Sequence, residues 1–159
     1  MTAPAARTGA LALVCLLGAC ASRAPMDDRD GGAYADVIEV QATGEPGNYL
    51  FSVAISSPDS GCARYADWWE VIGANGTLVY RRILAHSHVE EQPFTRSGGP
   101  VAIAADQEVI VRAHMHPNGY GGALMRGTVA TGFVADTTTP ADWAAGLAEM
   151  QPLPDGCAF

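Results

Sequence analysis

The sequence predicts an all-β domain, an antiparallel β-sandwich of the immunoglobulin-like or jelly-roll type with about seven strands and one short C-terminal helix. Short runs rich in β-branched and aromatic residues recur along the chain, and turn sequences rich in Gly, Pro, Asn and Asp separate them. Apolar and polar residues alternate within several of these runs. Since the chain has 159 residues and no internal repeat, one domain with one core is expected.

The clearest strands are those with strict alternation or an adjoining turn signal. The run 49–56 (YLFSVAIS) alternates, and the run 108–116 (EVIVRAHMH) alternates over a longer stretch. Asn75-Gly76 lies between two apolar runs and is typical of a tight β-hairpin. The expected strands are 36–42, 49–56, 68–72, 77–88, 101–104, 108–116 and 123–134, with a loop at 89–100.

The last part of the chain is expected to contain the helix. Thr139 is a suitable N-cap, and Pro140 after it suits the first helical position. This pattern predicts a short helix over 140–147, followed by a Pro-rich tail.

The N-terminal segment has the pattern of a secretory signal. Arg7 precedes a short apolar run at 11–18, which is too short to span a bilayer, and small residues lead to Cys20. The sequence Leu-Gly-Ala-Cys at 17–20 resembles the bacterial lipobox, which implies cleavage before Cys20 and attachment of lipid to its sulfur. An ordinary signal peptide with an incidental cysteine is the alternative.

These features predict a lipoprotein signal peptide at 1–20, a flexible polar tether at 21–33 and a β-sandwich domain at 34–159. A lipid anchor would make the membrane a partner of this protein. The residue after the cysteine is Ala21 and not aspartate, which favours the periplasmic side of the outer membrane in a bacterial cell envelope.

Composition excludes several classes of function. The formal net charge of −8 argues against nucleic acid as a partner and against a basic membrane-binding patch. The chain contains no lysine, which excludes Schiff-base chemistry. It also contains neither a nucleophile elbow nor a phosphate-binding loop, which favours binding over catalysis.

Two cysteines remain after the expected signal peptide and lipidation site. Cys62 and Cys157 most simply pair in an oxidising compartment and would fasten the C-terminal tail to the early part of the domain. Free thiols and soft metal ligands are the alternatives.

All four histidines fall in two His-x-His pairs, His86 with His88 and His114 with His116. Residues i and i+2 of a strand point to the same face, so each pair would present two imidazoles together. Both pairs are expected at strand ends, where scaffolds often carry functional groups. If the two strands are neighbours, the four imidazoles would form one transition-metal site, for copper or zinc.

Residues near the histidines would assist such a site. Glu90 and Glu91 could add an oxygen ligand or orient a ring, and Met115 would become a soft Cu(I) ligand if its strand kinked. Arg82 and Arg112 are expected on the histidine-bearing faces and oppose a cation unless paired. Two alternatives therefore stay open: a buried His/Arg/carboxylate network, and a site for an anion or polar ligand. A catalytic metal would further need an open coordination position with Glu90 or Glu91 as base.

The rival function is a non-catalytic adhesion or assembly module. Its surface would be formed by the loop 89–100 and by aromatic residues, of which one of Trp68 and Trp69 is expected in the core. With Tyr65 and Tyr120, the other would bind an envelope protein or a glycan.

The segments YADWWEV at 65–71 and RRILAHSHVEEQPFTRSGGP at 81–100 resemble those of uncharacterised bacterial secreted proteins and lipoproteins. The resemblance extends through VRAHM at 111–115. It implies export and carries no assigned activity.

Overall fold

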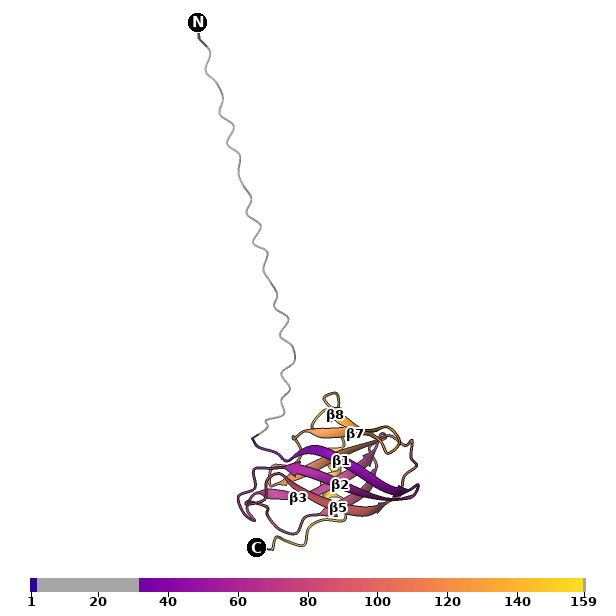
Figure 1. The fold of residues 1–159 in the computed structure, drawn as a ribbon. Helices are drawn as coiled ribbons and strands as arrows, with labels where there is room; N and C mark the ends of the chain where they lie inside the picture. Colours follow the sequence, from indigo (N-terminus) through magenta and orange to yellow (C-terminus); the bar gives the residue numbers. More distant parts are fainter. Residues whose placement is uncertain (3–31, 159) are drawn as a thin grey trace.

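The computed structural model describes residues 1–2 and 32–158, and the second range folds into two antiparallel β-sheets that face each other (Figure 1). One sheet has three strands in the order β1-β2-β5, and the other has five in the order β4-β3-β6-β7-β8. The strands are β1 (Asp36–Glu45), β2 (Asn48–Ser56), β3 (Tyr65–Gly73), β4 (Leu78–Ile83), β5 (Phe94–Val101), β6 (Val109–His116), β7 (Leu124–Thr128) and β8 (Gly132–Asp136). The predicted β-sandwich is confirmed, with eight strands in the described residues.

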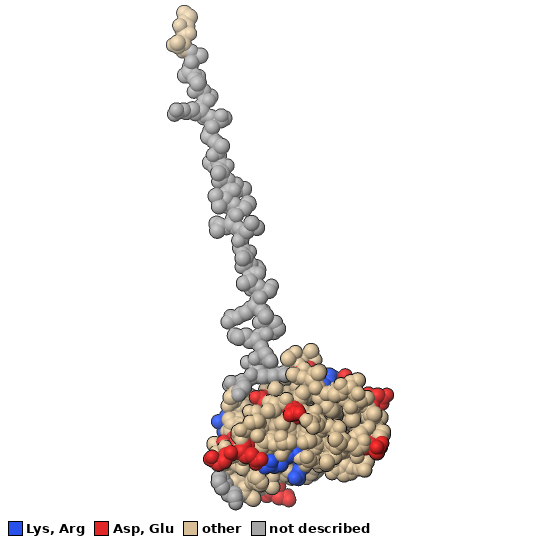
Figure 2. All heavy atoms as spheres, in the orientation of Figure 1, with Lys and Arg blue, Asp and Glu red and all other residues tan. Residues whose placement is uncertain are grey.

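The core lies between the two sheets and follows from the alternation in the sequence. Phe51, Val53 and Ile55 of β2 point inward and are fully buried. Trp69 and Val71 of β3 meet them from the other sheet. The opposite face of the three-stranded sheet is open to solvent, and Figure 2 shows it as mostly uncharged, with scattered acidic side chains and a small basic group low on the face.

The prediction of a loop at 89–100 is wrong from residue 94 onward, because residues 94–101 form β5. Gly99 and Pro100 indicated a turn, but β5 is an edge strand, where a residue without an N–H is tolerated. A Cβ at Gly99 would lie 2.6 Å from the carbonyl oxygen of Tyr49, so only glycine allows this close pairing with β2. The register shifts at the same place, between Tyr49 and Phe51.

The expected strand at 123–134 is a hairpin of β7 and β8. Gly132 has a φ of +86°, which permits the turn between them. A Cβ at Gly127 would lie 2.0 Å from the carbonyl oxygen of Gly132, so this pairing also requires glycine. The expected strand at 77–88 is also too long, because β4 ends at Ile83.

The helix expected at 140–147 is replaced by a short 3₁₀-helix, η1 (Ala145–Glu149). Arg112 donates hydrogen bonds to the carbonyl oxygens of Trp143 and Ala144, and Arg81 donates one to that of Leu147. The carbonyl oxygens of Ala144 and Leu147 also accept backbone N–H groups, and the longer helix is interrupted at Ala144, whose φ of +51° is left-handed.

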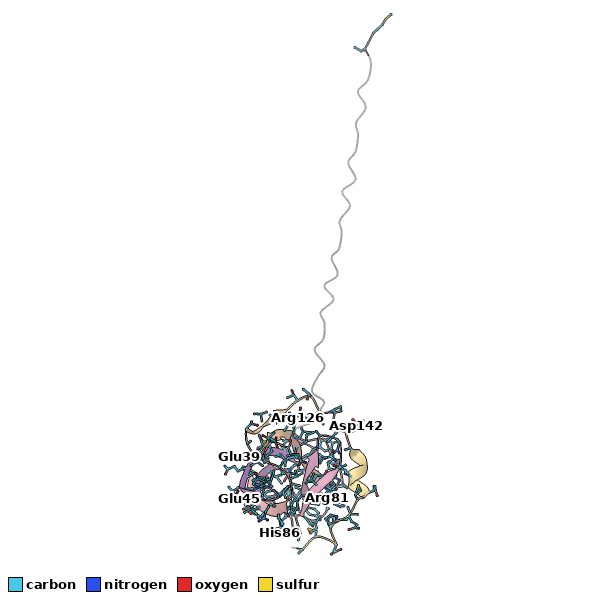
Figure 3. All side chains as sticks on the ribbon, turned by 90° about the vertical axis from the view of Figure 1, so that its right-hand side faces the viewer. Glu39, Glu45, Arg81, His86, Arg126 and Asp142 are labelled. Carbon is cyan, nitrogen blue, oxygen red and sulfur yellow. A yellow bond between two sulfur atoms is a disulfide. The ribbon has the colours of Figure 1, made fainter. Side chains whose placement is uncertain are left out.

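Residues 140–157, here called the C-terminal strap, lie against the outer face of the five-stranded sheet. Figure 3 shows η1 on the side of the molecule that carries Arg81, with Glu39 and Glu45 on the opposite side. The predicted disulfide is present: Cys62 and Cys157 are joined, with 5.5 Å between their Cα atoms. The disulfide thus fastens the end of the strap to the connection between β2 and β3.

Residues 3–31 lie outside the described residues, together with Cys20 and most of the expected signal peptide and tether. The predicted boundaries at residues 20 and 33 therefore stay predictions. The described ranges include no helix that is long and apolar enough to cross a membrane.

Candidate functional site

The two histidine pairs face different pockets. His86 and His88 line a pocket of 290 Å³, and His114 and His116 line a separate cleft of 450 Å³. Over residues 32–158, no three His, Cys, Asp or Glu side chains come together in a group that could hold a metal ion. The expected centre with four histidine ligands therefore has no support in the structure. The strand order explains this, because β3 lies between β4 and β6 and separates the two pairs.

The first pocket, here called the histidine pocket, lies beyond the end of β4. Its loop contacts the last residues of the chain through a bridge between His86 and Ala158. The lining residues are His86, Ser87, His88, Val89, Glu90, Glu91 and Ala158.

His88 is the most unusual side chain of this pocket. The residue is 4% exposed, yet neither Nδ1 nor Nε2 has a hydrogen-bond partner within residues 32–158, and Nδ1 lies 3.8 Å from Oδ2 of Asp59. Its ring stacks on Phe94, with 3.8 Å between the ring centroids. Burial lowers the pKa of His88, and the positive charge of Arg96 and the neighbouring His86 lower it further. The ring is therefore held in the neutral form with an unused lone pair.

His86 lies beside it on the solvent side. The two ring centroids are 4.5 Å apart and the ring planes are inclined by 42°. The Nδ1 atom of His86 is 3.3 Å from the carbonyl oxygen of Ser87, and no other hydrogen bond from the described part of the chain holds the exposed ring. The pair thus combines one fixed imidazole with one that can reorient.

A buried carboxylate fixes the loop that carries these rings. Asp59 accepts hydrogen bonds from the backbone N–H groups of Ala66 and His88, at 2.9 and 2.8 Å. It also accepts hydrogen bonds from the hydroxyl groups of Ser57 and Ser87. Because four donors from three chain segments converge on Asp59, the position of His88 is set by the fold.

The two glutamates expected near a metal have different surroundings. Glu91 accepts two hydrogen bonds from Arg96, at 2.7 and 3.1 Å, and this contact holds the pKa of Glu91 below its usual range. Glu90 is exposed and makes no hydrogen bond or ion pair with any residue of the described part of the chain. Glu90 is thus the carboxylate of this pocket that is open to a ligand.

The other predicted neighbours lie elsewhere, except for Arg82. Arg82 donates to the carbonyl oxygen of Ser97 and lines a smaller pocket of 120 Å³ with His86 and His88. Arg112 is bound to Glu70 on the outer face of the five-stranded sheet. Met115 is fully buried in the core, as expected for a regular strand, so it faces away from the histidines beside it.

The second pocket, here called the strap cleft, lies between the C-terminal strap on one side and the start of β3 and the end of β6 on the other. His114 dominates it. The Nδ1 atom of His114 is 2.7 Å from Oδ1 of Asp67, and its ring stacks on Trp68 with 3.7 Å between centroids. The cleft is lined by Cys62, Tyr65, Asp67, Trp68, His114, His116, Ala148, Glu149, Leu153, Pro154, Gly156 and Cys157.

The contact with Asp67 determines what His114 presents to the cleft. A carboxylate accepts a proton from Nδ1, so the neutral ring carries its hydrogen there and a lone pair on Nε2. Nε2 has no hydrogen-bond partner among residues 32–158. In that tautomer, Nε2 of His114 is an acceptor that faces the cleft, and the residue is 9% exposed.

His116 is exposed and leans on Tyr65, with 5.8 Å between the ring centroids. Burial raises the pKa of Tyr65, and the charges of Asp67 and Asp59 raise it further. His114 and His116 thus each pack on their own neighbour in β3, and they do not contact each other as His86 and His88 do.

The aromatic residues expected on a binding surface are not available for one. Trp69 is in the core, as expected for one of the two tryptophans, but Trp68 is only 3% exposed. The guanidinium group of Arg81 lies 4.5 Å from the ring centroid of Trp68, and that of Arg112 lies 3.4 Å from that of Tyr120. The C-terminal strap and the arginines that bind it cover the outer face of the five-stranded sheet, where an exposed tryptophan was expected.

Sequence reasoning missed the roles of Asp59, Asp67 and Phe94. The register between β3 and β6 shifts between Ala66 and Trp68, so Asp67 is the extra residue of a β-bulge. A bulge re-aims a side chain, and here it accompanies the contact of Asp67 with His114. The sequence shows a charged residue, Asp67, beside Trp68, but this pattern alone does not predict a bulge.

Comparison with known proteins gives a limited result. The chain is 38% identical over 92 residues to a protein of Halomicrobium mukohataei that bears the name "Putative lipoprotein". This match covers 57% of the present chain and 45% of the relative, so the chain matches less than half of that protein's length. No protein-family model and no solved structure matches the chain.

Proposed function

We propose that this protein is a lipid-anchored envelope domain that binds a divalent transition metal ion, copper or zinc, through His86 and His88. The observation that carries the proposal is the buried ring of His88 at the pocket: neither of its nitrogens has a hydrogen-bond partner among the described residues, and Oδ2 of Asp59 lies 3.8 Å from Nδ1, too far for a hydrogen bond. An unpaired buried polar group costs free energy, and a metal bond to one nitrogen would satisfy it.

The separation of the two rings is suitable for chelation. A metal–nitrogen bond of about 2.0–2.1 Å places a metal about 3.2 Å from the centroid of each imidazole, so two ligands at right angles have centroids about 4.5 Å apart. The observed separation of the His86 and His88 centroids is 4.5 Å. Because both nitrogens of His88 are buried, an ion would have to be reached by rotation of the exposed His86 ring together with a small opening at His88.

The surroundings favour a cation. Glu90 lines the same pocket and can supply an oxygen ligand, and water can complete the coordination. The positive charge of Arg96 would oppose an ion, but its pairing with Glu91 offsets this repulsion. The hydrogen bonds to Asp59 preorganise the loop before a metal binds.

Metal titration of the purified, untagged protein tests this proposal. Cobalt(II) absorption and copper(II) electron paramagnetic resonance should show one nitrogen-ligated ion per chain. His86→Ala should abolish the signal without unfolding the protein, because His86 is exposed. His116→Ala, the matched change in the other pair, should leave the signal unchanged. Equal loss in both variants, or no ion bound by the unaltered protein, would refute the site.

The anchor is proposed on separate grounds. The Leu-Gly-Ala-Cys sequence and the name of the Halomicrobium relative both support lipidation of Cys20. The residue Ala21 supports the periplasmic side of the outer membrane. Cys20→Ser should move the protein from the membrane fraction to the soluble fraction, and an unchanged membrane fraction would count against lipidation.

The alternative is a non-catalytic module that holds an envelope protein or a glycan, with the histidines in structural networks. The contact between His114 and Asp67 supports this for one histidine. The burial of Trp68 and Trp69 removes the exposed tryptophan on which the binding surface depended. Metal binding by the first pair is therefore the favoured function.

A further inference from the structure

We infer that the strap cleft is a binding site for a small molecule that carries a protonated amine, and that His114 accepts a hydrogen bond from this group. The site is separate from the histidine pocket and independent of the metal proposal. The inference rests on the cavity, on the orientation of His114 and on the chemistry of the lining residues.

The cavity has the size of a small-molecule site. Its volume is 450 Å³, within the range of about 300–1,000 Å³ that ligand pockets occupy. One wall is the sheet, with Asp67 and Trp68, and the other is the strap, with Glu149 and Leu153. The disulfide closes one end through Cys62 and Cys157 and holds the two walls at a fixed distance.

His114 determines that the ligand should carry a hydrogen-bond donor. Asp67 binds Nδ1, so Nε2 of the neutral ring is left as an acceptor with no donor among the described residues. Nε2 is not among the fully buried unpaired polar atoms, so a ligand donor there would replace water. A ligand with an N–H or O–H group would satisfy Nε2.

The carboxylates of the lining determine that the ligand should be positively charged. Asp67 and Glu149 line the cleft, and no described lining residue is Arg. Arg81 and Arg112 lie on the same sheet face, but both donate to Glu70 and to strap carbonyl oxygens. A carboxylate or phosphate would therefore meet repulsion without a cationic partner, whereas an ammonium group would be attracted.

The apolar part of a ligand also has a place. Tyr65 contributes an aromatic edge to the lining, whereas the ring of Trp68 is stacked on His114 and lies beside the guanidinium group of Arg81. Leu153 and Pro154 add aliphatic surface from the strap. A short alkylamine combines the groups that this lining selects.

The test uses three probes of the same length, n-butylamine, n-butanol and butyrate, titrated at neutral pH into the isotopically labelled protein. Nuclear magnetic resonance follows the ring nitrogens of His114 and the amides of the strap. Butylamine should give saturable shifts at these positions and bind about tenfold more tightly than either other probe, a difference of about 1.4 kcal/mol. Equal binding of butanol, tighter binding of butyrate, or no saturable shift at millimolar concentrations would overturn the inference.

Variants then locate the site. Glu149→Gln changes an exposed residue and should weaken butylamine binding severalfold while the protein stays folded. Glu45→Gln is the same chemical change on the opposite side of the molecule and should leave binding unchanged (Figure 3). His114→Ala should abolish binding. Equal weakening by both glutamine variants would mean that only the net charge of the protein attracts the amine, which contradicts a specific site.

Discussion

Glu70 and Arg81 form an ion pair in which neither side chain is exposed, with 2.6 Å between Oε2 of Glu70 and Nη2 of Arg81. The other carboxylate oxygen, Oε1, accepts a hydrogen bond of 2.8 Å from Arg112. The two guanidinium groups also donate to carbonyl oxygens of the strap, at Leu147, Met150 and Pro152 for Arg81 and at two further residues for Arg112. One carboxylate on β3 thus positions the two cations that hold the strap against the sheet.

Glu70→Gln should reduce the free energy of unfolding by about 3–5 kcal/mol, because it leaves two buried arginines without a counter-charge. Urea unfolding followed by tryptophan fluorescence measures this change. Glu45→Gln, an exposed glutamate with no ion pair in the described residues, is the control and should change the value by less than about 0.5 kcal/mol. A loss below about 1 kcal/mol for Glu70→Gln would show that the pair is dispensable.

Replacement of both Cys62 and Cys157 by serine should cost about 3–4 kcal/mol, because the disulfide closes a loop with a sequence separation of 95 residues. The disulfide stabilises the protein by reducing the conformational entropy of the unfolded chain. Denaturant unfolding of the double variant and of the reduced protein should give the same loss. If reduction destabilised the protein much less than the double substitution does, the serines themselves would be responsible.

Asp136 should make stability fall in acid. Burial alone would raise the pKa of Asp136, but hydrogen bonds from Thr138, Thr139 and Arg126 hold it well below its ordinary value of 3.8. The folded state thus binds a proton less readily than the unfolded state, and the stabilisation is present above about pH 4 and decreases as the pH falls further. Asp136→Asn should cost about 1–3 kcal/mol at neutral pH.

The difference between the unaltered protein and Asp136→Asn should therefore shrink as the pH falls below about 4. Unfolding midpoints measured from pH 7 to pH 2 test this. A difference that stays constant over the whole range would mean that the charge of Asp136 does not contribute.

Gly127→Ala should destabilise the β7–β8 hairpin, because its Cβ would lie 2.0 Å from the carbonyl oxygen of Gly132. The neighbour is backbone and cannot move aside, so the expected loss is about 3 kcal/mol. Gly146→Ala is the control, since its Cβ would meet nothing within 4 Å. Thermal unfolding compares the two variants, and similar melting temperatures would contradict the close approach of β7 and β8.

The neutral ring of His114 should carry its hydrogen on Nδ1, because Asp67 accepts it. The ring ¹⁵N chemical shifts distinguish this tautomer from the commoner one with hydrogen on Nε2. Asp67→Asn should reduce the preference, since an amide can also donate and no longer selects the Nδ1–H form. Observation of Nε2–H in the unaltered protein would remove the acceptor on which the amine site depends.

The fold class was predictable because alternation and turn residues report directly on strands. The run around Phe51 alternates so regularly that its buried face follows from the sequence, whereas β6 around Val111 is buried on both faces because the strap covers the outer one. Strand β5 was not predictable in the same way, since Gly98-Gly99-Pro100 has the composition of a turn. Its pairing with β2 depends on an edge position and a close backbone approach, which are properties of the assembled sheets.

The candidate sites were predictable as residue types and not as an arrangement. The His-x-His spacing identified four imidazoles, but the position of β3 between β4 and β6 is a long-range property that local patterns do not encode. The same holds for Asp59 and Asp67, which reach their histidines through a loop and a bulge. The pairing of Cys62 with Cys157 was predictable because no other described cysteine was left to pair.

The bond between Cys62 and Cys157 makes a covalent ring out of everything from β3 to the strap, including both histidine pairs. One proteolytic cut at any exposed turn within that ring would open the backbone without releasing a fragment. Since β1 and β2 precede the ring, a nicked molecule would also keep its connection to the N-terminal segment. With Cys20 lipidated as proposed, damage to a single loop in an environment rich in proteases would leave both pockets attached to the membrane.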